Sequence, residues 1–193
     1  MSQKKLTTLE YALLGLVGIS PMTGYDVHKV FATTPLAHFS SSPGAIYPAL
    51  RRLARIGLLE ARLDTARETR PRRVYSLTSA GDEALEVWLH QLVTREELIR
   101  GAGAPILRFS LAGGRLTREE ILNYLGSYQK TLADYLEELY GYTQETTSPE
   151  NLCGTLALFQ GIRSLESELK WTQWAAAEIK RADRGSRNSR PSR

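Results

Sequence analysis

Residues 40–55 read SSSPGAIYPALRRLAR, a stretch that combines the start of a helix with two faces of opposite character. Ser42 can accept a backbone hydrogen bond in the first helical turn, and Pro43 is well tolerated at the first helical position. A step of about 100° per residue divides the remaining side chains into two groups. One face is apolar and the opposite face is basic or small: Ile46, Leu50 and Leu53 against Gly44, Pro48, Arg51 and Arg55. The stretch therefore predicts a helix with one buried face and one face suited to anions.

Tyr47 and Arg52 lie on the shoulders between these two faces. Pro48 breaks a local rule, because a proline inside a helix removes a backbone hydrogen bond and costs about 3 kcal/mol. A broken rule on an exposed face is mild support for a functional site. Considered alone, the stretch fits two interpretations equally well: a functional helix that binds an anion, and an ordinary amphipathic surface helix with solvated arginines.

Positive charge is concentrated around this helix and at the end of the chain. The net charge of +4 divides into +3 over residues 1–90, −3 over residues 91–180 and +4 over residues 181–193. Residues 51–73 alone contain eight arginines and three acidic residues. A phosphate-binding surface needs such a concentration of charge, so double-stranded DNA is the expected partner.

The composition argues against several other classes of protein. The single cysteine, Cys153, cannot form an internal disulfide and has no metal-ligand spacing, which favours a reducing cytoplasm. The three histidines also lack metal-ligand spacing, and no phosphate-binding glycine loop or nucleophile motif is present. No run of about 18 apolar residues could span a membrane. We therefore expect a cytoplasmic protein that is not an enzyme and binds no metal, no other cofactor and no membrane.

Two shorter helical patterns precede the arginine-faced helix. Thr7 or Thr8 can cap a helix that ends near Gly18, and a second helix begins near Thr23 and stops at residues 33–35. A polar linker then leads to Ser42. This order predicts a helix-turn-helix whose last helix enters the major groove of DNA.

Two β-prone runs follow the helices. Residues 58–64 alternate between apolar and polar side chains, and residues 72–78 are rich in Val, Tyr and Thr. Their connection is too long for a tight turn and is rich in arginine. The pattern predicts the wing of a winged helix, in which Arg70, Arg72 and Arg73 contact phosphate or the minor groove. A plain solvated hairpin loop is the alternative.

Four fragments together resemble the successive signatures of the PadR family of winged-helix transcriptional regulators: LEYALLGLV, PMTGYDVHK, SPGAIYPALRRLARIGLLE and RRVYSLTSAGDEAL. They occur in the order and at the spacing of that family, and the helical remainder is similar in layout to its dimerisation region. The resemblance implies a homodimeric repressor that binds a pseudo-palindromic operator and responds to a small-molecule effector or another signal. It also implies that five residues lie at or near the DNA: Tyr25, Ser42, Gly44, Tyr47 and Arg51.

The helix itself suggests how the DNA would be held. We expect Ser41 and Ser42, with the backbone amides at the helix N-terminus, and either Arg51 or Arg52 to touch phosphates or guanines. A winged-helix module that binds another protein, without sequence-specific DNA binding, is the alternative function.

A further helix connects this region to the rest of the chain. Thr78 or Ser79 can cap it, and its apolar stripe runs from Leu85 to Leu92 before the glycines of residues 101–103 break it. The segment ILRFSLAGG that follows has no firm assignment. Trp88 is the best candidate for contact with an effector, because its helix joins the two halves; an anchor in the core is the alternative.

Two long helices form the C-terminal part. Thr117 and Glu120 form a capping box for the first, which ends before Gly141, and the second opens at residues 148–150 and reaches about Ala182. Their apolar surface exceeds what two helices can bury between themselves, which predicts a homodimer. A monomeric helical hairpin folded onto the winged domain is the rival. The expected dimer contacts are Leu158, Ile162, Leu165 and Leu169.

The predicted fold is mainly α with a small β-hairpin. A winged helix-turn-helix DNA-binding domain with its linker helix is expected over residues 1–100, and a long-helix dimerisation domain over residues 101–182. Residues 183–193 are basic and free of aromatic side chains, which predicts a disordered tail.

Overall fold

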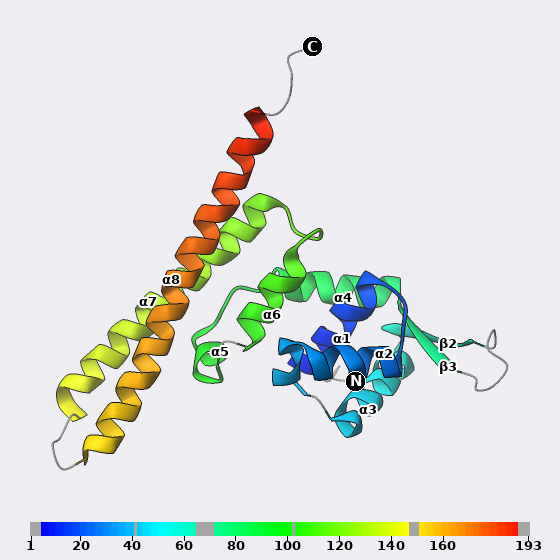
Figure 1. Cartoon of the computed structure of the whole chain (residues 1–193), viewed down its shortest axis with the longest axis horizontal. Helices are drawn as coiled ribbons and strands as arrows, with labels where there is room; N and C mark the ends of the chain where they lie inside the picture. Colours follow the sequence, from blue (N-terminus) through cyan, green and yellow to red (C-terminus); the bar gives the residue numbers. More distant parts are fainter. Residues whose placement is uncertain (1–4, 41, 65–71, 102, 147–150, 189–193) are drawn as a thin grey trace. The chain divides into compact units, whose positions relative to one another are not determined.

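The computed structural model describes residues 5–40, 42–64, 72–101, 103–146 and 151–188 (Figure 1). The chain is mainly helical, with one three-stranded sheet in the order β1-β3-β2. It divides into two compact units. The N-terminal unit comprises Met1–Gln91 and Ile106–Arg115, and the helical unit comprises Leu92–Pro105 and Leu116–Arg193.

Three helices begin the N-terminal unit: α1 (Thr8–Ile19), α2 (Gly24–Thr33) and α3 (Pro43–Arg55). Each has a hydroxyl side chain at its N-cap, respectively Thr7, Thr23 and Ser42, which confirms the three predicted helix starts. The short 3-10 helix η1 (Pro35–His38) occupies part of the predicted polar linker, where Thr34 caps it. The linker is therefore more ordered than its polar composition indicates.

The sheet confirms the predicted hairpin and adds a strand. β2 (Leu59–Asp64) and β3 (Arg72–Leu77) are antiparallel, with Leu59 opposite Leu77 and Asp64 opposite Arg72. The short β1 (Met22–Thr23) pairs with the other edge of β3. A strand of two residues is too short to show an alternating β-pattern in the sequence. β1 therefore forms only because the fold places it beside β3.

Apolar side chains from α1 to α4 (Ser79–Leu89) form the core of the N-terminal unit. The buried face of α3 is the predicted one, and its three apolar residues have no exposed area. At the full burial of such side chains, each contributes about 1.5–3 kcal/mol. The fully buried members of this core include Leu13, Leu14, Phe31, Ile46, Leu50, Leu53, Leu85 and Leu89.

The segment without a sequence assignment forms α6 (Gly103–Ala112), and residues 106–115 belong to the N-terminal unit. Leu111 lies against Gly15 of α1, where an added Cβ would be 2.4 Å from its methyl group. Arg115 forms an ion pair with Asp82 of α4 at 2.6 Å. This division differs from the boundary expected at residue 100. The reason is that α6 adds its apolar side chains to a core formed by residues far earlier in the chain.

The predicted continuous helix from residue 79 to the glycines near residue 101 is wrong. α4 ends at Leu89, and a new capping box between Thr94 and Glu97 begins the separate α5 (Arg95–Ile99). Leu92 lies between the two helices and is 59% exposed, so it does not extend the buried stripe of α4. The capping box explains the break, because the Thr94 side chain accepts a backbone hydrogen bond that would otherwise continue the helix.

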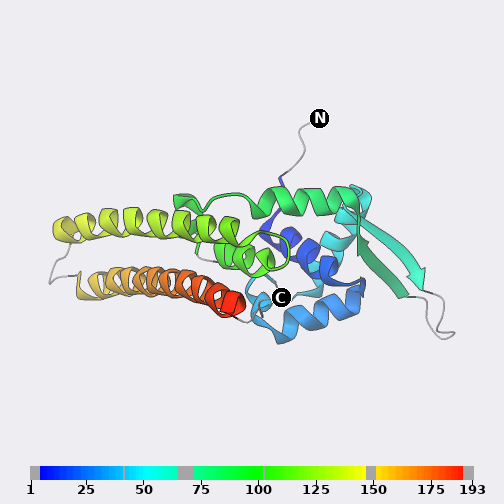
Figure 2. The same ribbon diagram turned by 90° about the horizontal axis from the view of Figure 1, so that it is seen from above.

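Two long helices, α7 (Arg118–Thr146) and α8 (Leu152–Asn188), run side by side in the helical unit (Figure 2). The Thr117–Glu120 capping box opens α7, as predicted. α7 continues through Gly141, and α8 continues past Ala182 into the segment expected to be disordered. Both helices run further than predicted because no proline interrupts residues 118–146 or 152–188. Residues 189–193 of the predicted tail lie outside the described residues.

The apolar stripe of α8 that was expected to pair two subunits is largely covered within one chain. Ile162 is 2% exposed, and Leu158, Leu165 and Leu169 on the same face are half-buried. α7 packs along α8, with Leu125 and Leu132 fully buried. The stripe therefore holds the helical hairpin together.

A polar pair lies inside this hairpin. The hydroxyl of Tyr128, which is fully buried on α7, donates a hydrogen bond to Oε1 of Glu168 on α8. Burial raises the pKa of Tyr128, and the carboxylate beside it raises it further. Burial also raises the pKa of Glu168, whereas the hydrogen bond from Tyr128 opposes that rise.

Replacing Tyr128 with phenylalanine is expected to destabilise the hairpin more at about pH 8 than at about pH 5. A carboxyl group with a raised folded pKa stabilises the fold below its unfolded pKa, and this contribution is lost as the pH rises through the folded pKa. Without the Tyr128 donor, the ionised and half-buried Glu168 would have one hydrogen bond fewer, at a cost of up to about 1.5–3 kcal/mol. Urea unfolding at both pH values measures the difference, and an equal loss at both would contradict it.

Candidate nucleic-acid interface

The N-terminus of α3 is open to solvent and well capped. Oγ of Ser42 accepts a hydrogen bond from the backbone N–H of Gly44 at 3.2 Å, and the N–H of Ser42 donates to Oγ of Ser40 at 3.2 Å. Residues 42–44 are exposed. A helix N-terminus concentrates N–H groups and partial positive charge, so this end can receive a phosphate oxygen.

The outer face of α3 is basic and projects away from the core. Arg51, Arg55 and Pro48 are exposed, while the three apolar residues of the inner face are fully buried. Neither arginine forms an ion pair with any residue that the structure describes. Both guanidinium groups are therefore available to an external anion.

Tyr47 holds one shoulder of α3 against α2. A Cβ added to Gly24 would be 2.6 Å from Cε1 of the Tyr47 ring, so the ring rests directly on the glycine backbone. Tyr47 is half-buried, and Tyr25 at the start of α2 is 62% exposed. Tyr25 is thus exposed enough for contact with DNA, whereas part of the Tyr47 ring is buried against α2.

Arg52 holds the other shoulder against α1, and its contact with DNA stays a prediction. Its guanidinium forms an ion pair with the buried carboxylate of Glu10. Burial alone would raise the pKa of Glu10, but hydrogen bonds from Thr7 and Arg52 outweigh that effect and hold the pKa below its ordinary value. The carboxylate is therefore ionised at neutral pH and engages Arg52 from inside the domain.

The strands present further cations beside the helix. Arg72 and Arg73 at the start of β3 are exposed, and Arg62 of β2 forms an exposed ion pair with Glu60 at 2.9 Å. The expected contacts of Ser41 and Arg70 lie outside the described residues. Of the ten residues predicted to bind DNA, seven are described with at least partial exposure and without a competing ion pair: Tyr25, Ser42, Gly44, Tyr47, Arg51, Arg72 and Arg73.

Trp88 is packed inside the N-terminal unit and is 4% exposed. The Tyr11 ring stacks on it at a centroid distance of 4.5 Å and an interplanar angle of 7°. The guanidinium of Arg108, itself 1% exposed, lies 4.9 Å from the indole centroid and donates to the backbone oxygen of Gln91. These contacts are those of a core anchor, and a ligand would reach the ring only by displacing a partner.

Three structural residues of this region were missed by the sequence reasoning: Glu10, Gly24 and Arg108. Glu10 carries a readable signal, since Thr7 and Glu10 have capping-box spacing. Gly24 and Arg108 carry none, because their contacts join segments that are distant in the sequence.

Two observations bear on other classes of function. Among the described residues, no group of three or more His, Cys, Asp and Glu side chains is arranged to hold a metal ion. Over the same part of the chain, no helix is long and apolar enough to cross a membrane.

Two solved structures resemble the chain over most of its length. One is Bacillus subtilis PadR in complex with operator DNA, whose sequence is 22% identical to this chain. The alignment covers 90% of this chain and 99% of that chain, with a TM-score of 0.41. A PadR-like transcriptional regulator from Bacillus cereus is 20% identical and covers 93% and 99%, with a TM-score of 0.40.

Part of the chain also matches at the level of sequence. The negative transcriptional regulator PadR of Bacillus subtilis is 30% identical over 84 residues, which cover 44% of this chain and 46% of that relative. The match thus spans under half the length of the relative. A sequence model of the transcriptional regulator PadR-like family matches residues 13–87, a range that includes α2, α3 and the whole sheet. The N-terminal winged-helix region of the chain is therefore similar to the transcriptional regulator PadR-like family.

Proposed function

We propose that the protein is a DNA-binding transcriptional repressor that acts in the cytoplasm as a homodimer on a pseudo-palindromic operator. The observation that carries the proposal is the outer face of α3, where Arg51 and Arg55 are exposed and form no ion pair with described residues. Repression, in place of activation, is supported by a relative that is 30% identical over 84 residues and is a negative transcriptional regulator.

In this proposal each subunit inserts α3 into the major groove. The capped N-terminus and Ser42 hold a phosphate, Arg51 reads a base or a second phosphate, and Arg72 and Arg73 grip the flanking backbone. Two subunits would place their α3 helices about 34 Å apart, which is one turn of DNA. The outward direction of these side chains meets the steric requirement for such contacts.

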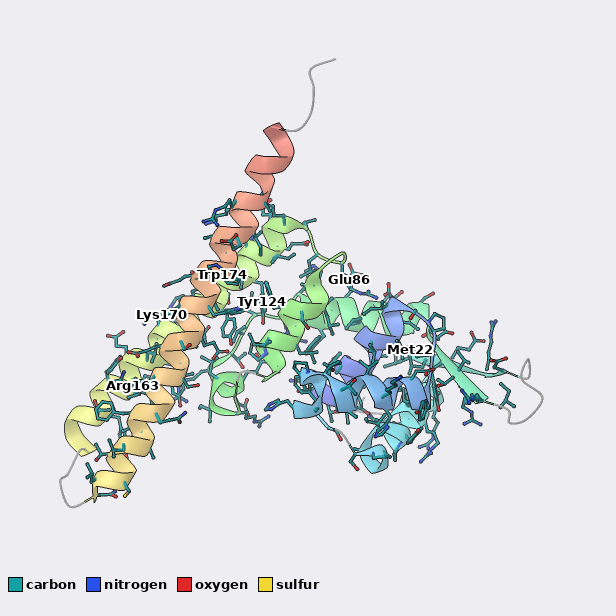
Figure 3. The ribbon with its side chains drawn as sticks, viewed as in Figure 1. Met22, Glu86, Tyr124, Arg163, Lys170 and Trp174 are labelled. Atoms are coloured by element: carbon teal, nitrogen blue, oxygen red, sulfur yellow. The ribbon has the colours of Figure 1, made fainter. Side chains whose placement is uncertain are left out.

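The dimer would use the face of α8 that α7 leaves uncovered. Leu156 is 58% exposed and Trp174 is 59% exposed, and a shallow hollow on this helix is lined by Leu156, Phe159, Gln160 and Arg163. In Figure 3, Arg163, Lys170 and Trp174 follow one another along α8. Of the dimer contacts predicted from the sequence, Ile162 is buried against the rest of the chain, while Leu158, Leu165 and Leu169 stay half-buried.

Replacing Phe159 with glutamate is therefore expected to convert the dimer to a monomer. A carboxylate at this position would lose its hydration in the interface, and burying a charge is costly even where a cation such as Arg163 of the same hollow lies near it. Sedimentation equilibrium measures the mass. As a control, Ser164→Glu adds the same carboxylate at an exposed position of α8 that does not line the hollow, and it should leave the dimer intact. A Phe159→Glu protein that sediments as the wild type does would contradict the assignment.

An effector would act by favouring a different spacing of the two α3 helices and thereby lowering the affinity for the operator. Trp88 stays the candidate contact, with the condition that Tyr11 or Arg108 moves aside. Quenching of tryptophan fluorescence by added ligand, absent in Trp88→Phe, is the supporting observation. A response that survives this substitution would remove Trp88 from the site.

The double substitution of Arg51 and Arg55 by alanine is expected to weaken DNA binding. A lost base contact costs about 1–3 kcal/mol on the selected site, and each lost phosphate contact lowers the salt slope by about one. Duplexes selected from a random library by the wild type serve as the probe, titrated at several salt concentrations. Arg100→Ala is the matched control, because Arg100 is an exposed arginine of the other unit, paired with Glu96. Unchanged affinity in the double variant would refute the proposal.

The alternative, a winged-helix module that binds protein and not DNA, predicts no salt-dependent binding of any duplex. The same titration of the wild type therefore separates the two functions.

A further inference from the structure

Glu10 is a buried carboxylate that neither DNA contact nor apolar packing explains. The residue is 4% exposed and lies in the first turn of α1. Its Oε2 accepts hydrogen bonds from the backbone N–H of Thr7 at 2.8 Å and from the Thr7 hydroxyl at 3.1 Å. Its Oε1 accepts a hydrogen bond from the guanidinium of Arg52. Glu10 therefore joins the capped end of α1 to α3.

The apolar face of α3 leaves one motion weakly restrained. The buried face is a single narrow stripe formed by Ile46, Leu50 and Leu53. Such a stripe holds the helix at a fixed distance from the core, but it restrains rotation about the helix axis only weakly. Tyr47 and Arg52 lie on the two opposite edges of that stripe. Contacts at both edges can restrain rotation in both directions.

Each edge residue has a defined partner on a different helix. Tyr47 rests on Gly24 of α2, and Arg52 is paired with Glu10 of α1. The capping box fixes the Glu10 carboxylate relative to the backbone of α1, so the partner of Arg52 cannot easily follow a rotating α3. A charge-assisted hydrogen bond is both stronger and more directional than an apolar contact.

We infer that the Glu10–Arg52 pair is a positioning contact, which sets the rotation of α3 about its axis and thereby the direction of Arg51 and Arg55. The inference rests on the proposed role of α3 in DNA binding. A rotation of about 20° at a radius of about 5–6 Å displaces a side chain by about 2 Å. Such a shift is large enough to break a hydrogen bond to a base edge while leaving attraction to the phosphates intact.

The test compares Glu10→Gln, Arg52→Gln and the double variant with the wild type. Glu10→Gln keeps the size of the side chain and one oxygen for the Thr7 N–H, but removes the charge that holds Arg52. Two probes are used: a duplex selected from a random library by the wild type, and a scrambled duplex of the same composition. The ratio of the two affinities measures specificity, and titration over salt concentration counts the phosphate contacts.

Each single variant is expected to lose about tenfold in specificity, within the range of residues that modulate a site without touching its ligand. The double variant should lose no more than the singles, because both remove the same contact. The salt slope should stay at the wild-type value in all three. Val17→Ala, which trims a buried side chain of α1 away from the pair, controls for general loss of stability and should keep the wild-type specificity.

A fall of about one in the salt slope of Arg52→Gln, with Glu10→Gln behaving as the wild type, would overturn the inference and make Arg52 a phosphate contact. Losses that add in the double variant would also overturn it. Failure of the proposed function is distinguishable, because the wild type would then select no duplex. In that event urea unfolding of the same four proteins still reports whether the two residues are coupled.

Discussion

Replacing Trp88 with alanine is expected to lower the free energy of unfolding of the N-terminal unit by about 3–5 kcal/mol. The indole is 4% exposed, and its removal takes away the surface on which the Tyr11 ring stacks. It also leaves the fully buried Arg108 guanidinium without the aromatic ring 4.9 Å from it. Urea unfolding followed by circular dichroism measures the loss.

Val87→Ala is the matched control for this prediction. Val87 precedes Trp88 on α4 but is 67% exposed, so its truncation should change the stability by no more than about 0.5 kcal/mol. Trp88→Phe keeps an aromatic ring and should recover part of the loss. Equal stability of the Trp88→Ala and Val87→Ala proteins would show that the ring is not the anchor that its burial indicates, and would restore a ligand-binding role as the better explanation.

The contrast between Trp88 and α3 shows which features can be predicted from the sequence. α3 can be predicted from the local sequence, because its cap, its apolar stripe and its arginine face all lie within residues 40–55. Trp88 carries only an ambiguous local signal, since an aromatic residue on a helix is compatible with a core and with a pocket. Its partner Arg108 comes from a segment with no assignable pattern, so the ambiguity could be resolved only by the fold.

Arg52 illustrates the same limit within the candidate site. The helical pattern places it on the shoulder of α3, from which an arginine can turn outward to DNA or inward to a carboxylate. The choice depends on Glu10, which is 42 residues earlier in the chain. Helix periodicity predicts the face of a residue but cannot identify a partner on another helix.

The C-terminal helices show a different limit. Their periodicity correctly predicts two long helices with an apolar stripe on each. An apolar stripe can be covered by a neighbour in the same chain or by a second copy, and the sequence pattern is the same in both cases. Ile162 is buried within one chain, so the dimer contacts that we propose are at the exposed Leu156 and Trp174 of α8 instead.

Replacing Gly81 with alanine is expected to destabilise the winged helix by about 3 kcal/mol, at the upper end for overpacking of a core. An added Cβ would lie 2.0 Å from the backbone oxygen of Leu58 and 2.9 Å from Cδ1 of Leu77. The Leu58 oxygen cannot easily move, because it accepts a hydrogen bond from the N–H of Thr78 at 3.3 Å. The first turn of α4 would therefore have to separate from the segment that joins α3 to β2.

Gly126 provides the opposite case in α7. It is also a helical glycine, but a Cβ added there would meet no atom within 4 Å apart from its chain neighbours and the adjacent helix backbone. Gly126→Ala should stabilise the protein by about 0.5–1 kcal/mol, since alanine has the higher helix propensity and a smaller loss of backbone entropy. The two substitutions add the same methyl group to the same kind of backbone, so helix propensity alone predicts a gain for both. Urea unfolding of the two variants should instead give changes of opposite sign, because only at Gly81 does the methyl group meet a carbonyl oxygen that the sheet and helix hold in place.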